Sequence, residues 1–102
     1  MGRLSHQGLR ILKLFLQEVT FEFSGADVIK STRMLSGTVY PILLRFEQDG
    51  LMESRWEEKD PHQLRRPRRR LYRLTGKGAA FARSALRQVS VNVMLSPLSE
   101  SV

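Results

Sequence analysis

The sequence predicts a mainly helical α+β domain, with three helices before a two-stranded hairpin and one long helix after it. Two observations carry this prediction. Apolar residues recur at three- and four-residue spacing in the first half of the chain and again near its end, as in amphipathic helices. Between those regions the side chains alternate with a period of two, as in half-buried strands. The chain has 102 residues and no long linker, so we expect one domain with a small core.

The first two helices are expected over residues 5–19 and from Gly25 to about Ser31. A regular apolar stripe predicts the first: Leu9, Leu12, Phe15, Leu16 and Val19. The second should begin at the N-cap Ser24, with Asp27 completing a capping box. Its inward residues are expected to be Ala26, Val28 and Ile29. Residues 32–35 then form the turn of a helix-turn-helix.

The helix expected over residues 36–49 organises the domain. Ser36 is predicted to be its N-cap, and Gly50 can end it in the left-handed conformation. One face carries the apolar stripe Val39, Ile42, Leu43 and Phe46. The opposite face combines a small residue, a phenol, an arginine and an amide, and it consists of Gly37, Tyr40, Pro41, Leu44, Arg45 and Gln48. Such a face can approach a nucleic-acid groove.

Two strands should follow, over residues 52–57 and 68–75, joined by a polar loop that contains Pro61 and Pro67. In the first strand Met52, Ser54 and Trp56 share one face. A hairpin placed after a helix-turn-helix is a wing. The predicted fold is therefore a winged helix-turn-helix with a two-stranded wing.

A last helix should begin at the cap Thr75 and stop at Pro97, before a disordered tail from Leu98. Its apolar stripe follows 4-3-4 spacing: Ala82, Leu86, Val89 and Val93. We expect residues 1–75 to form the winged helix-turn-helix and residues 76–102 the last helix and tail, together as one compact unit. A chain this small has little other surface to cover that stripe, so it should pair with a second copy.

The positive charge is concentrated in one region of the chain. The net charge is +7, yet residues 1–60 hold eight Lys/Arg against nine Asp/Glu, whereas residues 61–99 hold nine Lys/Arg and no acid. A focused basic patch indicates a polyanionic partner, with nucleic acid first and an anionic membrane second. The alternative is a solvated surface that only aids solubility.

Composition excludes several other classes of protein. The chain has no cysteine, so disulfides and thiolate metal sites are absent, and a reducing cytoplasm fits. Its longest apolar cluster, residues 9–16, is too short to span a bilayer. His6 and His62 lie far apart in sequence, so neither a metal cluster nor a nucleophile–base pair is visible. We expect no enzyme activity and no cofactor, metal or membrane partner.

Three motifs occur in succession: residues 36–51 (SGTVYPILLRFEQDGL), residues 53–57 (ESRWE) and residues 66–78 (RPRRRLYRLTGKG). Together they resemble the PadR family of bacterial winged-helix transcriptional regulators, over roughly residues 9–86. The resemblance implies a homodimer that binds operator DNA and usually represses. It places the recognition helix at residues 36–49 and the wing tip around residues 60–67. It places dimerisation on the last helix with help from the first.

The expected DNA contacts divide into two kinds. Tyr40 and the backbone N–H groups at the helix start can bind phosphates without reading sequence. Arg45 and Gln48 can reach base edges, and Leu44 can touch a thymine methyl. The wing arginines should meet the minor groove or its phosphates. The full predicted set is Arg33, Ser36, Gly37, Thr38, Tyr40, Leu44, Arg45, Gln48, Arg65, Arg66, Arg68 and Arg69.

Each of these assignments has a structural alternative. Tyr40 can pack against the base of the wing, Thr38 can serve only as a cap, and Leu44 can pack on a neighbouring helix. Arg33 is either a phosphate contact or a solvated charge. Trp56 is predicted to lie in the core or the dimer interface.

The residues expected at the dimer interface are Leu12, Phe81, Ala82, Leu86, Val89 and Val93. Small members of the family use an aromatic-lined cavity between subunits for flat effectors, so a small hydrophobic or aromatic effector is a further expected partner. Phe81 is the only aromatic residue that the last helix offers to such a cavity. The alternative function is a winged-helix module that binds protein or structured RNA without an operator. The slim, cationic face of residues 37–45 favours DNA, because a protein-binding wing would not need it.

Overall fold

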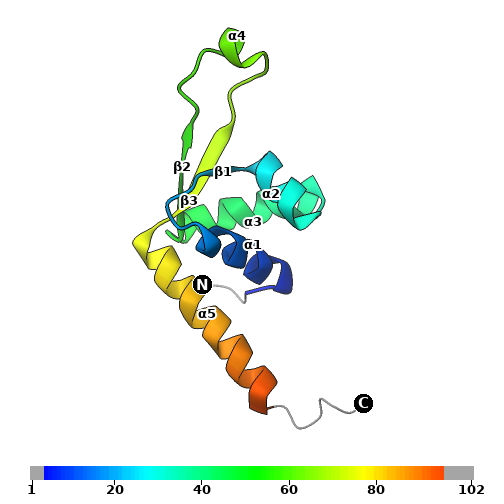
Figure 1. Ribbon diagram of the computed structural model, residues 1–102, viewed down its shortest axis with the longest axis vertical. Helices are drawn as coiled ribbons and strands as arrows, with labels where there is room; N and C mark the ends of the chain where they lie inside the picture. Colours follow the sequence, from blue (N-terminus) through cyan, green and yellow to red (C-terminus); the bar gives the residue numbers. More distant parts are fainter. Residues whose placement is uncertain (1–3, 96–102) are drawn as a thin grey trace.

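The computed structural model describes residues 4–95, with side chains described as far as Val91 (Figure 1). The helices are α1 (His6–Gln17), α2 (Gly25–Thr32), α3 (Ser36–Gln48), α4 (Pro61–Leu64) and α5 (Gly76–Leu95). The strands are β1 (Phe23–Ser24), β2 (Met52–Trp56) and β3 (Arg70–Leu74). This is the predicted winged helix-turn-helix. The expected stop at Pro97 and the tail after it lie outside the described residues.

Side-chain caps begin the first two helices, and the cap of the second was predicted. Ser5 Oγ accepts from the Gly8 N–H at 2.9 Å. Ser24 Oγ accepts from the Asp27 N–H at 3.1 Å, while the Asp27 carboxylate accepts from the Ser24 N–H at 2.9 Å, which confirms the capping box. One inward assignment was wrong, because Ala26 is exposed. Only Val28 and, in part, Ile29 face the core from that set.

The core lies where α1, α3 and the sheet meet. The first helix buries Gly8, Ile11, Leu12 and Phe15. Ile11 is fully buried although the predicted stripe left it out. At Gly8 a side-chain Cβ would stand 3.2 Å from the Phe46 ring, so α3 approaches α1 closely at this point. The buried face is therefore rotated from the predicted one, and Leu9, Leu16 and Val19 lie half-buried at its edges.

The sheet has three antiparallel strands in the order β1-β3-β2. The hairpin of β2 and β3 is the predicted wing, with Ser54 opposite Tyr72 and Trp56 opposite Arg70. The short strand β1 was not predicted, since two residues cannot show a period. It pairs Phe23 with Tyr72 and so ties the helix-turn-helix to the wing. The predicted loop between the wing strands also contains α4, which Asp60 caps.

The last helix is joined to the rest of the fold through Thr75. Its hydroxyl accepts from the Gly78 N–H at 2.9 Å, as predicted for a cap, and donates to the Gly50 carbonyl at 2.7 Å. Gly50 itself has φ +77°, so it ends α3 in the predicted left-handed conformation. Beyond its first turns α5 projects away from the body of the domain (Figure 1). No helix within residues 4–95 is long and apolar enough to cross a bilayer.

Two of the predicted interface residues belong to the subunit's own core. Leu12 and Ala82 are both fully buried within the single chain, which leaves them no surface for a partner to touch. Their assignment to dimerisation is therefore corrected. Phe81 also packs partly against this core. Val93 lies beyond the side chains that the structure describes.

Candidate nucleic-acid interface

The third helix presents the predicted polar face to solvent. Its apolar stripe anchors the helix in the core, because Val39 and Leu43 are fully buried and Phe46 is 4% exposed. This anchoring fixes the rotation of the helix, so that one side stays free. The exposed residues on that side are Gly37, Tyr40, Pro41, Leu44, Arg45 and Gln48, as predicted. An exposed helix face with an arginine and an amide has the reach and the donors to enter a major groove.

The start of α3 differs from the prediction. Leu35 occupies the N-cap position without a side-chain cap, and Ser36 is the first helical residue. The N–H groups of Thr38 and Val39 both donate to the Leu35 carbonyl, at 2.9 and 3.0 Å. The N–H groups of Ser36 and Gly37 are left at the helix start, where the helix dipole favours an anion. The N-terminus of α3 can therefore still bind a phosphate, although Ser36 does not cap the helix.

Tyr40 packs closely on the N-terminus of α2. A Cβ on Gly25 would stand only 2.2 Å from Tyr40 Cε1, so the ring lies where any larger residue would put its side chain. The phenol is nevertheless 47% exposed. Glycine at position 25 thus places the ring against the helix and leaves its outer side open to a ligand.

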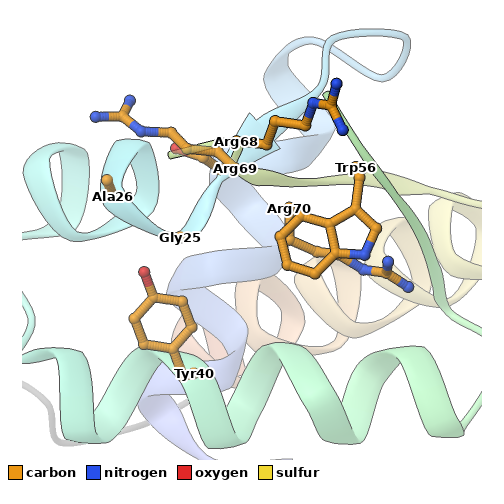
Figure 2. Close-up of a pocket in the computed structure, with 8 residues that line it drawn as sticks. Gly25, Ala26, Tyr40, Trp56, Arg68, Arg69 and Arg70 are labelled. Atoms are coloured by element: carbon orange, nitrogen blue, oxygen red, sulfur yellow. The ribbon is translucent and has the colours of Figure 1, made fainter. Parts of the chain in front are cut away.

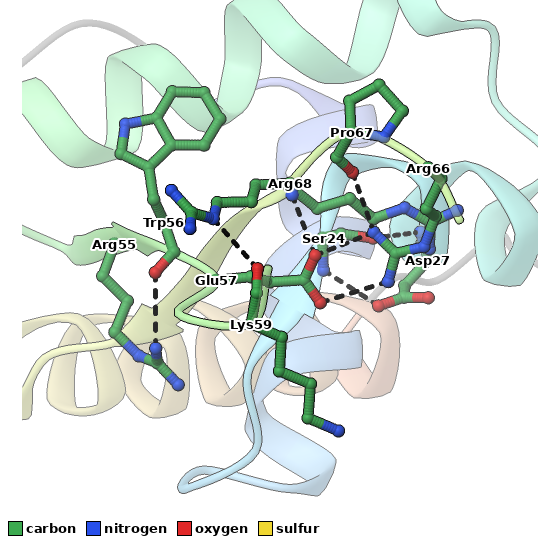
Figure 3. Close-up of polar contacts among 10 residues, drawn as sticks. Ser24, Asp27, Arg55, Trp56, Glu57, Lys59, Arg66, Pro67 and Arg68 are labelled. Carbon is green, nitrogen blue, oxygen red and sulfur yellow. Dashed lines mark hydrogen bonds and ion pairs between the residues drawn. The ribbon is translucent and has the colours of Figure 1, made fainter. Parts of the chain in front are cut away.

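The carboxylate of Glu57, directly after β2, holds the wing loop in its conformation. Glu57 accepts two hydrogen bonds from the Arg66 guanidinium, at 2.7 and 3.1 Å, and a third from the Arg69 N–H at 2.9 Å (Figure 3). These donors, Arg66 first, lower the pKa of Glu57 from 4.5 to about 2. The carboxylate is therefore charged throughout the physiological range, and the guanidinium of Arg66 is engaged within the wing.

Two of the remaining predicted arginines lie at the ends of helices, and the others lie on α3 and in the wing. Arg33 and Arg65 have φ of 62° and 58° and end α2 and α4 in the left-handed conformation, with both side chains exposed. Arg68 Nε donates to the Lys59 carbonyl at 2.9 Å. Among the described side chains, those of Arg45, Arg65, Arg68 and Arg69 form no ion pair within 4 Å, so their charges remain available to an external anion.

Ion pairs neutralise the other side of the wing. Arg55 pairs with Glu22 at 2.6 Å, and Arg73 pairs with Glu53 at 2.6 Å. These contacts raise the pKa of both guanidinium groups. Arg45, Arg65, Arg68 and Arg69, on α3 and the wing, therefore keep charges that these carboxylates do not neutralise.

Trp56 does not lie in the core, because 58% of its surface is exposed. Its cross-strand partner Arg70 holds a guanidinium over the indole, 5.2 Å from the ring centroid. Arg70 Nε also donates to Ser54 Oγ at 2.8 Å. Sequence reasoning missed this pair. The alternation placed Trp56 and Ser54 on one face, but it could not show that the buried part of that face ends before Trp56.

The pair borders a cavity of about 270 Å³ between α2, α3 and the wing (Figure 2). We call it the aromatic–arginine cleft. It is lined by Ser24, Gly25, Ala26, Tyr40, Trp56, Arg68, Arg69 and Arg70. Within residues 4–95, no group of three or more His, Cys, Asp and Glu could hold a metal ion. The site is thus one of arginines and aromatic rings.

Comparison with known families gives one match over most of the chain. The model of the transcriptional regulator PadR-like family matches residues 16–84. That range runs from the end of α1, through α2, α3 and the wing, into α5. A search of curated protein sequences found no significant match.

Solved structures share the fold. A PadR family transcriptional regulator from Eggerthella lenta DSM 2243 superposes with a TM-score of 0.75 at 24% identity, over 94% of this chain and 86% of its own. The protein smu.1704 from Streptococcus mutans UA159 gives 0.68 at 26% identity, over 91% and 86%. A transcriptional regulator from Clostridium thermocellum gives 0.72 at 18% identity, over 88% and 85%.

Proposed function

The chain belongs to the PadR-like family of transcriptional regulators, and from this premise we propose that it acts as a homodimeric repressor on a two-fold symmetric operator. The observation that carries the proposal is the exposed face of α3 beside a wing that carries Arg65, Arg68 and Arg69 without ion pairs among the described side chains. In this arrangement α3 enters the major groove, where Arg45 and Gln48 contact base edges. Arg65, Arg68 and Arg69 bind the neighbouring backbone or minor groove.

The shape of α5 supports the dimer. The helix has 20 residues, or about 30 Å at 1.5 Å per residue. Its first turns pack on α1, where Ala79 and Ala82 are buried. Farther along, Val89 and Val91 are 41% and 47% exposed. Apolar side chains on a projecting helix are typical of a surface that a second copy covers.

A shallow groove runs beside these residues. It measures about 430 Å³ and is lined by Leu16, Arg83, Leu86, Arg87, Ser90 and Val91. Leu16 brings α1 into the same surface, as expected if the first helix assists dimerisation. In place of Leu12 and Ala82, we propose Leu16, Leu86, Val89 and Val91 as the described residues at the interface. An effector, if one binds between subunits, would lie against this groove.

Repression requires selective DNA binding, which a random-duplex selection tests. The purified protein should enrich one palindromic sequence and retain it in the presence of excess unrelated duplex. Two-fold symmetry predicts half-sites about one helical turn apart. Placing that sequence over a promoter should lower transcription from it in a purified system. If no duplex is enriched, or if the protein prefers structured RNA or a protein ligand, the proposed function is wrong.

The dimer has its own test. Light scattering should give a mass of two chains, twice 11.8 kDa, at micromolar concentration. Replacing Leu86 and Val89 by Asp should give monomers, because two carboxylates would then have to be buried against a partner. Leu35→Asp and Leu44→Asp place the same carboxylates at exposed positions before and on α3, away from α5, and should leave the dimer intact. A wild-type mass of one chain would contradict the proposal.

A further inference from the structure

The chemistry of the aromatic–arginine cleft suits an anion that also has an apolar side. Its lining carries three guanidinium groups and, among the residues described there, no carboxylate. The indole of Trp56 is exposed next to these charges, although a large apolar ring in water is unfavourable without a partner. A DNA backbone unit has both properties, since its phosphodiester is charged and its deoxyribose is largely apolar.

The cleft is also placed where the backbone must pass. The two grooves of B-DNA are separated by a sugar–phosphate strand, so a protein with one element in each groove straddles that strand. Here the cleft opens between α3 and the base of the wing (Figure 2). Tyr40 from α3 and Trp56 from β2 stand on its two sides. A strand that separates the groove at α3 from the groove at the wing would run along it.

The guanidinium of Arg70 is held in position before any ligand arrives. Ser54 Oγ accepts its Nε proton at 2.8 Å, the indole of Trp56 lies beneath it, and Glu47 stands 3.8 Å from Nη2. These contacts restrict the side chain and leave donors on its terminal nitrogens for an incoming oxygen. A fixed guanidinium loses less entropy on binding an oxyanion than a mobile one.

We propose that the aromatic–arginine cleft holds one DNA backbone phosphodiester per subunit. Arg70 donates to its oxygens and the flanking deoxyribose packs on Trp56, while Tyr40 and Arg69 stand farther along the cleft, toward the neighbouring phosphate (Figure 2). This inference rests on the proposed function, because it requires DNA bound by α3 and the wing. It adds Trp56 and Arg70 to the interface, and neither was among the residues predicted to contact DNA.

The first experiment uses intrinsic fluorescence, because Trp56 is the single tryptophan of the chain. The full-length protein is titrated with the duplex enriched by selection. Emission should change with the same midpoint as binding measured by anisotropy of a labelled duplex. If anisotropy shows binding while Trp56 emission stays constant, the cleft is empty in the complex and this inference fails alone. If no duplex binds, the proposed function fails instead.

Inorganic phosphate is the matching control for a free anion. It carries the charge of the backbone unit without its sugar, so millimolar phosphate alone should leave the emission nearly unchanged. A change with inorganic phosphate as large as that with duplex would assign the cleft to a small anion. That result would overturn the DNA backbone as its occupant.

The second experiment removes the two partners one at a time. Single phosphates of the duplex are replaced by neutral methylphosphonates, and Arg70→Gln removes the facing cation. Loss of one phosphate contact should flatten the slope of log K against log salt by about 0.9, which is on the order of fivefold in affinity at 0.15 M salt for each subunit. At one phosphate per half-site, Arg70→Gln and the methylphosphonate should not add, because each removes the same contact.

Two further variants complete this double-mutant cycle. Arg69→Gln removes a second cation of the cleft without touching the Ser54 contact, so it tests the neighbouring phosphate in case Arg70→Gln disturbs the wing. Lys13→Gln removes the same charge from an exposed position on α1, outside the cleft, and should be additive with every methylphosphonate. Full additivity for both arginine variants at every position would overturn the inference. Non-additivity at one backbone position per half-site supports it.

Discussion

Two glycines in the first turn of α5 should respond in opposite directions to the same substitution. A Cβ on Gly78 would stand 1.8 Å from the Leu51 carbonyl oxygen and 2.7 Å from its carbon, whereas real Cβ contacts are essentially never under 3.0 Å. Both atoms belong to the backbone, so no side chain can rotate away. At Gly76, two residues earlier in the same turn, nothing lies within 4 Å of the added Cβ.

The size of the expected change in stability follows from this geometry. To restore a contact of 3.4 Å from 1.8 Å, α5 and Leu51 must separate by about 1.6 Å. Leu51 and Ala82 are fully buried nearby, so this movement opens the core as well. Forcing extra volume into a packed core costs about 1–3 kcal/mol or more. The better helix propensity of Ala returns at most about 1 kcal/mol. Gly78→Ala should therefore destabilise, whereas Gly76→Ala should stabilise by about 0.4–1 kcal/mol.

Thermal unfolding monitored by circular dichroism at one fixed protein concentration measures both effects. For a domain of this size, each kcal/mol shifts Tm by about 4–8 °C. The two variants share a residue change, a helix and a turn, so helix propensity alone would move them together. A Tm for Gly78→Ala equal to or above that of the wild type would refute the close approach of α5 to Leu51.

The remaining predictions concern DNA binding and pH. Arg45→Ala should cost about 1–3 kcal/mol at one base pair of each half-site and leave non-specific binding nearly unchanged, which titration of operator and single-substitution duplexes measures. Replacing Arg65 and Arg68 by Ala should weaken all duplexes about equally and flatten the salt slope by roughly 0.9 per lost contact; selective loss of operator binding would reverse these roles. The pKa of Glu57 is lowered in the folded chain from 4.5 to about 2, so its stabilising effect is present above pH 4.5 and is lost as pH falls toward 2. Glu57→Gln should therefore reduce the acid dependence of unfolding in that window, and an unchanged acid limb would contradict the Arg66 contact.

Local sequence patterns predicted most of the fold because they depend on neighbours along the chain. The capping box of Ser24 and Asp27 satisfies backbone donors within one turn, so it works in any tertiary context. The stripe Val39, Ile42, Leu43 and Phe46 fixed which side of α3 faces solvent. The exposed residues on the opposite face of that helix followed from it.

Other errors arose where a second element decides the outcome. The predicted stripe left out Ile11, although Ile11 lies at helical spacing from Gly8 and Phe15; the close approach of Phe46 to Gly8 shows that this side of α1 faces α3. Leu12 and Ala82 each belong to an apolar stripe that was predicted to contact a partner subunit. The packing of α5 on α1 instead buries both residues within one subunit. Leu35 took the cap position predicted for Ser36, and only the path of the turn determines where the first helical residue falls.

The sequence by itself determined the order of α1, α2, α3, the two wing strands and α5, together with the basic wing and the exposed face of α3. Tertiary structure alone decided how the charges are used. It placed Glu57 against Arg66, nine residues along the chain, and Trp56 against Arg70 across the hairpin. It also brought Gly78 against the Leu51 backbone. The sequence alone shows only that glycine weakens a helix, whereas the packing of α5 on Leu51 leaves no room for a larger residue. The physical reason is that periodicity reports the faces of isolated elements, whereas these roles depend on distances between elements that only the folded chain sets.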